Sequence, residues 1–530
     1  MIDASTNNPL LTDLFSSLSV EAELLINDAA DDVVKTSSQL PAIRITGLSG
    51  DSRHLRDGEA FIALPGGNVH GLDFIDSVEE RASIVIADWQ DVQERKVDTH
   101  LPVVMVRDLA QQLGELVSAC NGHPSRSISV CGITGTDGKT STARFVVNAL
   151  QLLGKKAGFI GTIGWGIGDD LTSIDLTTPS VVDVHAMLAE LREKGAEFIV
   201  MEVSSHALVQ GRVDGVWFDV AVLTNLGRDH LDYHLTLDNY KAAKKNLFTW
   251  PNLSAAVINF DDDFGIELLD EIQKQIPGLC GYSANAASDA ASNSVPMLYA
   301  QDVRIDSNGL SFVLCAGDER WQIDSALMGR FNISNMLAAV GVLRSFGIPM
   351  ADTVNAICKL QDVPGRMEAF KKSGAPTLVV DFAHTPQALE SAIRTVREHC
   401  DGQLWVVFGC GGDRDAGKRP LMGAVAEKFA DKIIVTDDNP RSESSKQIIT
   451  DIIAGMSVDP IAQDEYSSLN SVSAIADRRT AIVAAFENAE SDDWILVAGK
   501  GHENIQIVGS ERRPFSDRDI AQTLTAVEVV

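Results

Sequence analysis

A short run of glycines and hydroxyl residues carries the clearest chemical signal in the sequence. Its members are Gly135, Thr136, Asp137, Gly138, Lys139, Thr140 and Ser141. Glycines let backbone N–H groups approach phosphate oxygens, a lysine neutralises phosphate charge, and a threonine hydroxyl can bind Mg²⁺. The common GxxxxGK[ST] spacing is not met, because position 133 is Ile. A glycine turn with a solvated lysine is the alternative, but the apolar strand before the run and the helical segment after it favour a phosphate-binding loop.

Two further residues follow segments that are predicted to be parallel strands. Glu202 comes directly after the apolar run EFIVM, and His230 comes after AVLTNLGRD. A carboxylate, an imidazole and a loop hydroxyl form a ligand set that suits Mg²⁺ or Mn²⁺ bound to phosphates. From these residues alone, a hydrogen-bonded structural role for His230 is an open alternative.

Alternating strand-like and helix-like segments are expected to position these residues. They include EAFIAL and PVVMV near the N-terminus, EFIVM and AVLTNL in the middle, and LWVVFG, KIIVTDDNP and WILVAGKGHE near the C-terminus. The alternation predicts an α/β fold with mostly parallel sheets, in which ligand-binding groups follow the carboxyl ends of strands. Because 530 residues are too many for one core, we predict three domains, at residues 1–108, 109–364 and 365–530.

Composition excludes several classes of function. The chain has 44 Lys and Arg against 74 Asp and Glu, a net charge of −30, which repels nucleic acids and anionic membranes. No apolar run is long enough to span a membrane, and no basic residue precedes Lys35 to form the start of a secretory signal. The seven cysteines include no CxxC pair, which disfavours a structural zinc site. We therefore expect a cytoplasmic protein that binds phosphates only locally.

Motifs spread along the chain carry a family resemblance. They are GTDGKTS (135–141), TTPS (177–180), MEVSSHALVQGR (201–212), TNLGRDHLDYH (224–234), YKAAK (240–244), MGRFNISN (328–335), PGRME (364–368), DFAHTP (381–386), FGCGGDRDAGKRP (408–420), DDNPR (437–441) and AGKGHE (498–503). Together they resemble the MurE-type Mur ligases, the UDP-N-acetylmuramoyl-tripeptide synthetases of peptidoglycan assembly. The resemblance extends from about Ser49 to Asp517.

The resemblance implies a three-domain architecture and a reaction. The expected domains are an N-terminal UDP-substrate recognition domain, a central P-loop-type ATPase domain and a C-terminal Rossmann-like domain that binds the amino acid. The D-glutamyl γ-carboxylate of UDP-N-acetylmuramoyl-L-alanyl-D-glutamate would attack the γ-phosphate of ATP, and an amino group would then attack the acyl phosphate. Mg²⁺ and a lysine are needed because a carboxylate and a triphosphate repel each other.

The same resemblance assigns catalytic and metal-binding roles. Lys139, Thr140, Glu202 and His230 match the phosphate and magnesium positions of the family. Lys244 matches the lysine that the family carbamylates with CO₂ to N6-carboxylysine, and a carbamate offers a hard cation an anionic oxygen. Without the motif set, Lys244 would be one more lysine on a solvated helix face.

Substrate-binding positions follow by the same comparison. Residues near the adenine, the ribose or the interdomain hinge are Asn332, Arg366 and Asp381. Residues that hold the UDP-muramoyl dipeptide are Ser52, Thr177, Thr178, Ser204, Gln210 and Arg212. The sequence departs from the family pattern in two places. The first forty or so residues have no counterpart in the family, and Asp137 stands where the family more usually has Asn.

The third substrate is expected to bind the C-terminal domain. Asp438, Asn439, Pro440 and Arg441 resemble the meso-diaminopimelate signature, and the positions that complete the pocket are Arg414, Gly499 and Glu503. An arginine offers a bidentate fork to the distal carboxylate, while Glu503 can hold an ammonium group. The alternatives are a simple Asp-Asn-Pro turn with a surface arginine, a sister ligase that adds L-lysine, a folylpolyglutamate synthetase, and a catalytically silent nucleotide-binding scaffold. We expect a monomer whose partners are its three substrates.

Overall fold

The computed structural model describes residues 10–18, 22–28, 31–36, 43–66, 69–95, 97–285, 295–457 and 471–526. The chain forms two compact units, one of residues 1–280 and 342–347, the other of residues 281–341 and 348–530. It crosses between them within β14 (Gly278–Ser283), within α11 (Phe331–Ser345) and just after α11. In the described ranges, no helix has the length and apolar character that crossing a membrane requires.

The N-terminal part of the first unit is a six-stranded sheet in the order β2-β1-β6-β5-β4-β3. Its strands are β1 (Ala22–Asp28), β2 (Asp31–Thr36), β3 (Leu48–Ser49), β4 (Ala60–Ala63), β5 (Ile84–Asp88) and β6 (Val103–Val106). Side chains alternate along β4, so Ile62 packs in the hydrophobic core on one face of the sheet and Phe61 packs in the core on the other face. Helices α1 (Leu11–Leu18) and α4 (Leu109–Cys120) cover the first face, and α2 (Ile75–Val78) and α3 (Trp89–Arg95) cover the second.

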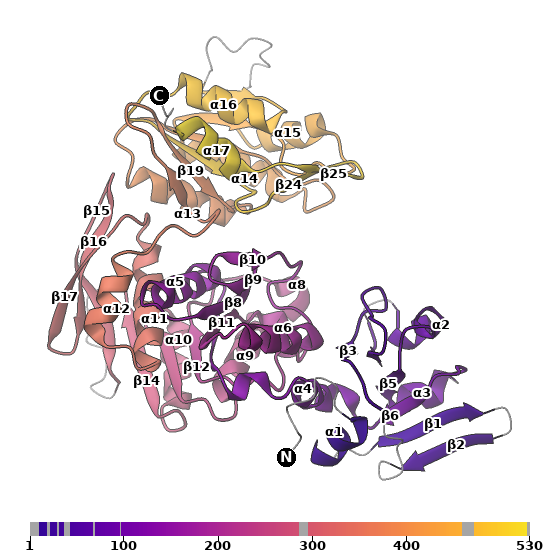
Figure 1. Ribbon diagram of the computed structural model, residues 1–530. Helices are drawn as coiled ribbons and strands as arrows, with labels where there is room; N and C mark the ends of the chain where they lie inside the picture. The colour runs from indigo at the N-terminus through magenta and orange to yellow at the C-terminus, as the bar shows by residue number, and fades with distance from the viewer. Residues whose placement is uncertain are drawn as a thin grey trace. The chain divides into compact units, whose positions relative to one another are not determined.

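In the central part of the same unit, the neighbouring strands β10-β9-β8-β11-β7-β12-β13 follow one another in this order, and β14 pairs next to β13. They are β7 (Ser129–Thr134), β8 (Ala157–Gly161), β9 (Gly164–Ile167), β10 (Asp170–Thr172), β11 (Phe198–Glu202), β12 (Val220–Leu223) and β13 (Ala255–Asn259). Strands β8, β11, β7, β12 and β13 are parallel, so their carboxyl ends meet at one edge. The helices that Figure 1 labels here are α5 (Lys139–Leu152), α6 (Val181–Glu193), α8 (Leu231–His234), α9 (Leu237–Lys245) and α10 (Asp263–Ile272). The short helix α7 (Ser205–Val209) follows β11.

The second unit contains an antiparallel ribbon and a second α/β sheet. The ribbon is β15 (Met297–Asp306), β16 (Gly309–Ala316) and β17 (Glu319–Ser325). The sheet runs β18-β19-β23-β20-β21-β22, with β18 (Glu368–Phe370), β19 (Thr377–Asp381), β20 (Leu404–Phe408), β21 (Lys432–Val435), β22 (Val472–Ala474) and β23 (Trp494–Ala498). All neighbours except β18 and β19 pair in parallel.

Helices cover both faces of this sheet (Figure 1). One face packs α13 (Pro386–Arg397), α14 (Lys418–Phe429) and α15 (Ser445–Ile453), and the other packs α16 (Arg478–Asn488) and α17 (Asp517–Thr525). The unit also contains residues 331–341 of α11, helix α12 (Met350–Ile357) and the hairpin of β24 (Ile505–Val508) and β25 (Glu511–Pro514). The predicted α/β class is confirmed, whereas domain boundaries at residues 108 and 364 stay predictions.

Candidate active site

The glycine run connects β7 to α5, as the sequence predicts. Gly138 precedes the helix with φ +80°, and Gly135 has φ +154°. A Cβ at Gly135 would lie 1.7 Å from the Thr224 hydroxyl oxygen, so only glycine fits there. The loop therefore presents its backbone at the amino end of a 14-residue helix, a favourable place for phosphate.

The end of β12 holds the loop in shape. The Asn225 side-chain oxygen accepts hydrogen bonds from the backbone N–H groups of Thr136 (3.1 Å) and Asp137 (2.9 Å), and the Thr224 hydroxyl donates to the Asp137 carbonyl (2.6 Å). The Asp137 carboxylate is exposed, so it avoids the cost of a buried charge. Sequence reasoning did not single out Asn225, although a polar pair directly after a buried strand was a signal.

Two lysines meet at one carbonyl of the loop. Lys139 Nζ donates to the carbonyl oxygens of Gly135 (2.9 Å) and Thr136 (2.8 Å), and Lys244 Nζ donates to the same Gly135 oxygen (2.7 Å). Lys244 is 1% exposed and lies over the Tyr240 ring. Burial, and then repulsion from Lys139, holds the pKa of Lys244 well below its usual value. Lys244 is therefore not a lysine on a solvated helix face.

A buried carboxylate ends the neighbouring strand β11. Glu202 is fully buried, and its Oε2 accepts hydrogen bonds from the hydroxyls of Thr140 (2.9 Å) and Thr162 (3.0 Å). Its Oε1 accepts from the Thr162 N–H (2.9 Å). These neutral donors do not cancel the charge, and the site therefore offers clustered oxygens to a cation. A Cβ at Gly161 would lie 2.3 Å from Oε1, which explains the glycine.

His230 is linked to the phosphate loop through aromatic neighbours. Its ring packs edge-on against His206 at 4.8 Å and Tyr240 at 6.2 Å between centroids, and it is about half exposed. Tyr240 in turn shares a hydrogen bond with the Thr136 hydroxyl (3.1 Å). Across the described ranges, no three His, Cys, Asp or Glu side chains are close enough to hold a metal ion by themselves. The magnesium role of His230 stays a prediction.

Most of the predicted UDP-substrate residues form one hydrogen-bonded chain. The Thr178 hydroxyl donates to the Glu202 carbonyl (2.8 Å) and accepts from the Ser204 N–H (3.1 Å). Arg212 donates to the Thr178 carbonyl (2.9 Å) and to the Gln210 side chain (2.5 Å). Thr177 is linked to this chain of hydrogen bonds by its hydroxyl, which lies 3.1 Å from the hydroxyl of Thr162. Ser52 lies outside this chain, in the N-terminal sheet region, where its carbonyl accepts from Arg81 (2.9 Å).

The predicted diaminopimelate residues gather at the carboxyl edge of the C-terminal sheet. The Asn439 amide donates to Glu503 Oε2 (3.0 Å), and a Cβ at Gly499 would lie 2.6 Å from the Asp438 carboxylate. The Arg441 guanidinium donates to the Gly412 carbonyl (2.7 Å). A Cβ at Gly411 would lie 2.9 Å from Arg441 and 3.7 Å from Arg414, and one at Gly412 would lie 1.9 Å from the Pro440 carbonyl. The Gly411–Arg414 loop after β20 and the Asp438–Arg441 loop after β21 are therefore in contact.

A buried lysine in this pocket was missed by sequence reasoning. Lys500 is fully buried and donates to Glu503 Oε2 (2.8 Å) and to the Asn439 side-chain oxygen (3.1 Å). Burial alone raises the pKa of Glu503, but Lys500 and Asn439 lower it below its usual value. Glu503 is thus an anion at neutral pH.

The predicted adenine, ribose and hinge residues are only partly brought together. Asp381 accepts from the backbone N–H groups of Met367 (2.8 Å) and Ala383 (2.9 Å), and burial raises its pKa against the opposing effect of Arg366. Arg366 lies over the Phe382 ring at 4.8 Å. Asn332 makes its hydrogen bonds elsewhere, to the Met328 carbonyl and from the Asn335 side chain.

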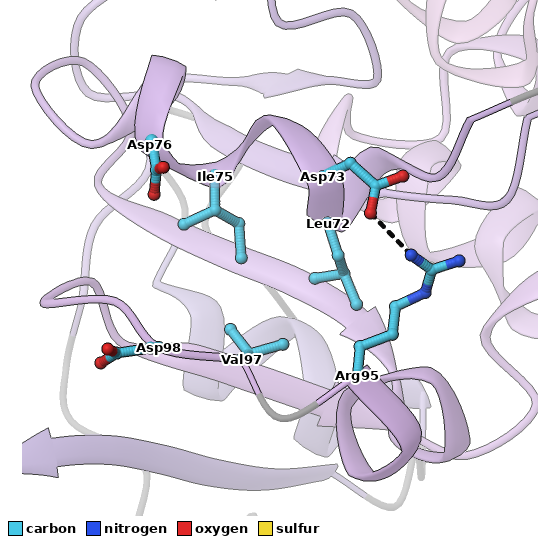
Figure 2. Close-up of a pocket in the computed structure, with 7 residues that line it drawn as sticks. All are labelled: Leu72, Asp73, Ile75, Asp76, Arg95, Val97 and Asp98. Carbon is cyan, nitrogen blue, oxygen red and sulfur yellow. Dashed lines mark hydrogen bonds and ion pairs between the residues drawn. The ribbon is translucent and has the colours of Figure 1, made fainter.

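A surface pocket in the N-terminal sheet region contains none of the predicted site residues. Figure 2 shows its lining, which includes the ion pair of Asp73 and Arg95 at 2.6 Å, and its volume is about 190 Å³. The lining also includes Leu72 and Ile75 of the region after β4. Its acidic residues give it no complementarity to phosphates.

Comparisons with known proteins agree with this geometry. The Mur ligase family catalytic domain matches residues 44–120, the Mur ligase middle domain matches 133–343, and the Mur ligase glutamate ligase domain matches 365–501. A UDP-N-acetylmuramoyl-L-alanyl-D-glutamate–2,6-diaminopimelate ligase of Pseudomonas aeruginosa is 42% identical over 91% of this chain and 95% of its own. The chain belongs to the Mur ligase family.

Solved structures of Mur ligases share its architecture. A structure of a UDP-N-acetylmuramoyl-L-alanyl-D-glutamate–2,6-diaminopimelate ligase matches with a TM-score of 0.66 and 33% identity, over 92% of this chain and 96% of that one. A MurF ligase of Thermotoga maritima in complex with ADP matches with a TM-score of 0.58 and 19% identity, over 85% and 93% of the two chains. The second similarity concerns the fold alone. The predicted three-domain Mur ligase architecture is confirmed.

Proposed function

We propose that this Mur ligase uses ATP to join meso-2,6-diaminopimelate to UDP-N-acetylmuramoyl-L-alanyl-D-glutamate through an acyl phosphate. The observation that carries the proposal is that the Asp438–Arg441 loop contacts both the Gly411–Arg414 loop and the Gly499–Glu503 loop at one edge of the C-terminal sheet. The 42% sequence identity to the diaminopimelate ligase of Pseudomonas aeruginosa, over 91% of this chain, supports the proposal of the same substrates.

The phosphate loop and its surroundings fit ATP with Mg²⁺. Mg²⁺ would neutralise the triphosphate and polarise the γ-phosphoryl group toward an attacking carboxylate. Thr140 and Glu202 would hold it, because their oxygens already lie 2.9 Å apart and the Glu202 charge lacks a neutralising donor. Lys139 would move from the loop carbonyls to the transferring phosphoryl group, where a cation stabilises the developing charge.

Lys244 is suited to carbamylation. Only a neutral amine attacks CO₂; the product is a carbamate and a released proton. The lowered pKa of Lys244, caused by burial and by Lys139, raises the neutral fraction at physiological pH. The carbamate would place a negative charge beside the Lys139 ammonium and supply an anionic oxygen to a hard cation.

The C-terminal pocket favours an amino acid with two carboxylates. Arg441 and Arg414 would bind the distal carboxylate of diaminopimelate, whereas L-lysine has no group to pair with them. An unpaired charged donor in a pocket costs about 1–3 kcal/mol or more, and sites built around a polar group reject analogues that lack it by roughly 10⁴-fold. Strong discrimination against L-lysine follows.

A product assay tests the function. The purified chain is incubated with the UDP-muramoyl dipeptide, ATP, Mg²⁺ and an equal mixture of meso-diaminopimelate and L-lysine, and the products are read by mass spectrometry. We expect the tripeptide that contains diaminopimelate to form together with ADP, with almost no tripeptide that contains L-lysine. Comparable lysine incorporation would mean that the Asp-Asn-Pro-Arg segment is only a turn. No product with either amino acid would support the silent scaffold instead.

We further propose that the ligase acts as a monomer in the cytoplasm, where ATP and UDP-linked precursors are available. Sedimentation with and without substrates tests the oligomeric state. A stable dimer under both conditions would contradict the monomer.

A further inference from the structure

Arg478, at the first position of α16, is fully buried in the C-terminal sheet region. Its Nε and Nη2 donate to the two carboxylate oxygens of Asp517, over 2.8 and 2.7 Å. Asp517 lies in the first turn of α17 and is also fully buried. The two helices are therefore joined by a bidentate ion pair away from solvent.

The remaining hydrogen bonds of Arg478 reach the backbone of two pocket loops. Its Nη1 donates to the Asp437 carbonyl (3.2 Å), and its Nη2 also donates to the Ala498 carbonyl (2.9 Å). Asp437 directly precedes Asp438, and Ala498 directly precedes Gly499. One guanidinium group thus forms hydrogen bonds with the residues that directly precede both loops of the predicted amino-acid pocket.

We propose that Arg478, held by Asp517, is a positioning residue that sets the distance between the Asp438–Arg441 loop and the Gly499–Glu503 loop, and thereby the affinity for the diaminopimelate substrate. This inference rests on the proposed function. Arg478 touches no predicted substrate position through its own hydrogen bonds, and it acts through the backbone that carries them.

The surrounding charges explain why the residue is an arginine. The pocket contains the carboxylates of Asp438 and Glu503, and burial raises the pKa of Asp438 while Arg478 and Lys500 oppose the rise. A cation at Arg478 therefore also opposes the rise in the pKa of Asp438. Lysine would supply the charge but not the planar fork that reaches Asp517 and two carbonyls at once.

Kinetics of Arg478→Lys test the role. We expect the KM for diaminopimelate to rise about tenfold or more, because small misplacements of binding groups are costly, while the KM values for ATP and the dipeptide stay within about twofold. Equal rises in all three KM values, or none, would overturn the inference. If wild type forms no diaminopimelate product, the proposed function fails instead.

A double variant separates positioning from stability. Arg478→Met with Asp517→Leu removes both buried charges together, a change that often leaves stability unchanged or improved. We expect its thermal unfolding to stay near that of wild type while the KM for diaminopimelate remains raised, because the Asp437 and Ala498 carbonyls lose their donor. Recovery of a wild-type KM would show that the pair serves only stability. Where Arg478→Lys fails to fold, this variant supplies the decisive KM.

Arg397, the last residue of α13, provides a control that matches the chemical change, although its side chain is 38% exposed. It pairs with Asp431 at 2.5 Å and donates to the Gly402 carbonyl, next to the amino ends of β20 and β21. Arg397→Lys makes the same chemical change at the opposite edge from the pocket. We expect its KM for diaminopimelate to match wild type, and a rise like that of Arg478→Lys would overturn the inference.

Discussion

Lys139 and Lys244 both donate a hydrogen bond to the carbonyl oxygen of Gly135, over 2.9 and 2.7 Å. Two ammonium groups at one acceptor repel each other, and burial of Lys244 adds to the cost of its charge. The arrangement favours a neutral Lys244 and a charged Lys139. Each lysine therefore has a separate expected role, and each role can be tested.

Lys139→Ala should reduce kcat by about 10²-fold or more, because the loop loses the cation that stabilises the transferring phosphoryl group. Thermal unfolding should change little, since Lys139 is not part of a hydrophobic core. Steady-state kinetics and a melting curve check both statements. A folded variant with near-normal ATP-dependent product formation would place the nucleotide elsewhere.

Lys244→Ala should be inactive and partly rescued by acetate, which can replace the missing anionic group. Native activity should also fall when CO₂ is removed at mildly acidic pH, because protonation of the amine and loss of CO₂ both reverse carbamylation. Lys241→Ala, on the same helix but paired with Glu267, serves as the control and should keep its activity. Full activity of Lys244→Ala without added anion would refute the carbamate.

Arg441→Lys should lose chiefly diaminopimelate activity, with kcat/KM falling by at least about tenfold because a charge-assisted hydrogen bond is lost. Activity at the phosphate site, measured as the KM for ATP, should stay the same. Arg394→Lys, an exposed residue paired with Glu390, is the control. An unchanged preference for diaminopimelate over L-lysine would remove Arg441 from the pocket.

Asp137→Asn should lower the KM for ATP by about two- to threefold, because an exposed carboxylate beside the phosphates contributes roughly 0.5 kcal/mol of repulsion. Asn225 and Thr224 hold the backbone of residue 137, so the loop should keep its shape. The effect should shrink at high salt. Asp318→Asn, with the same charge change in the β16–β17 turn, should have no effect. A higher KM would mean that the carboxylate helps to bind ATP.

His185 should make stability depend on pH. It is fully buried in α6 and donates from Nε2 to the Asp214 carbonyl, and burial lowers its pKa to about 4. In the unfolded chain its pKa is about 6.5, so the unfolded state takes up a proton first as pH falls, and stability is lost between about pH 6.5 and 4.

From pH 7 to pH 5 this loss amounts to about 2 kcal/mol. His185→Gln keeps a donor for Asp214 but does not titrate, so its unfolding free energy in urea should fall by about 2 kcal/mol less over that range. Parallel pH curves for the two proteins would contradict the assignment.

Features that depend on neighbouring residues in the chain were predictable from the sequence. The strand, glycine loop and helix around Lys139 follow from a buried apolar run, two glycines with positive φ and a helical segment, all within 24 residues of one another. The Asp-Asn-Pro-Arg segment likewise follows a buried strand, β21. Local sequence determines such units because their hydrogen bonds and burial pattern repeat over a few residues.

Only the tertiary structure decided which distant residues complete the sites. Strand β7 lies between β11 and β12, so the loop after β7 meets Glu202 on one side and Asn225 on the other. Arg478 reaches the Asp437 and Ala498 carbonyls because α16 packs across β21 and β23. Strand order in a parallel sheet does not follow chain order, since helices connect strands that need not be neighbours. For that reason, the hydrogen bonds that clamp the phosphate loop and the amino-acid pocket cannot be read from spacing in the sequence.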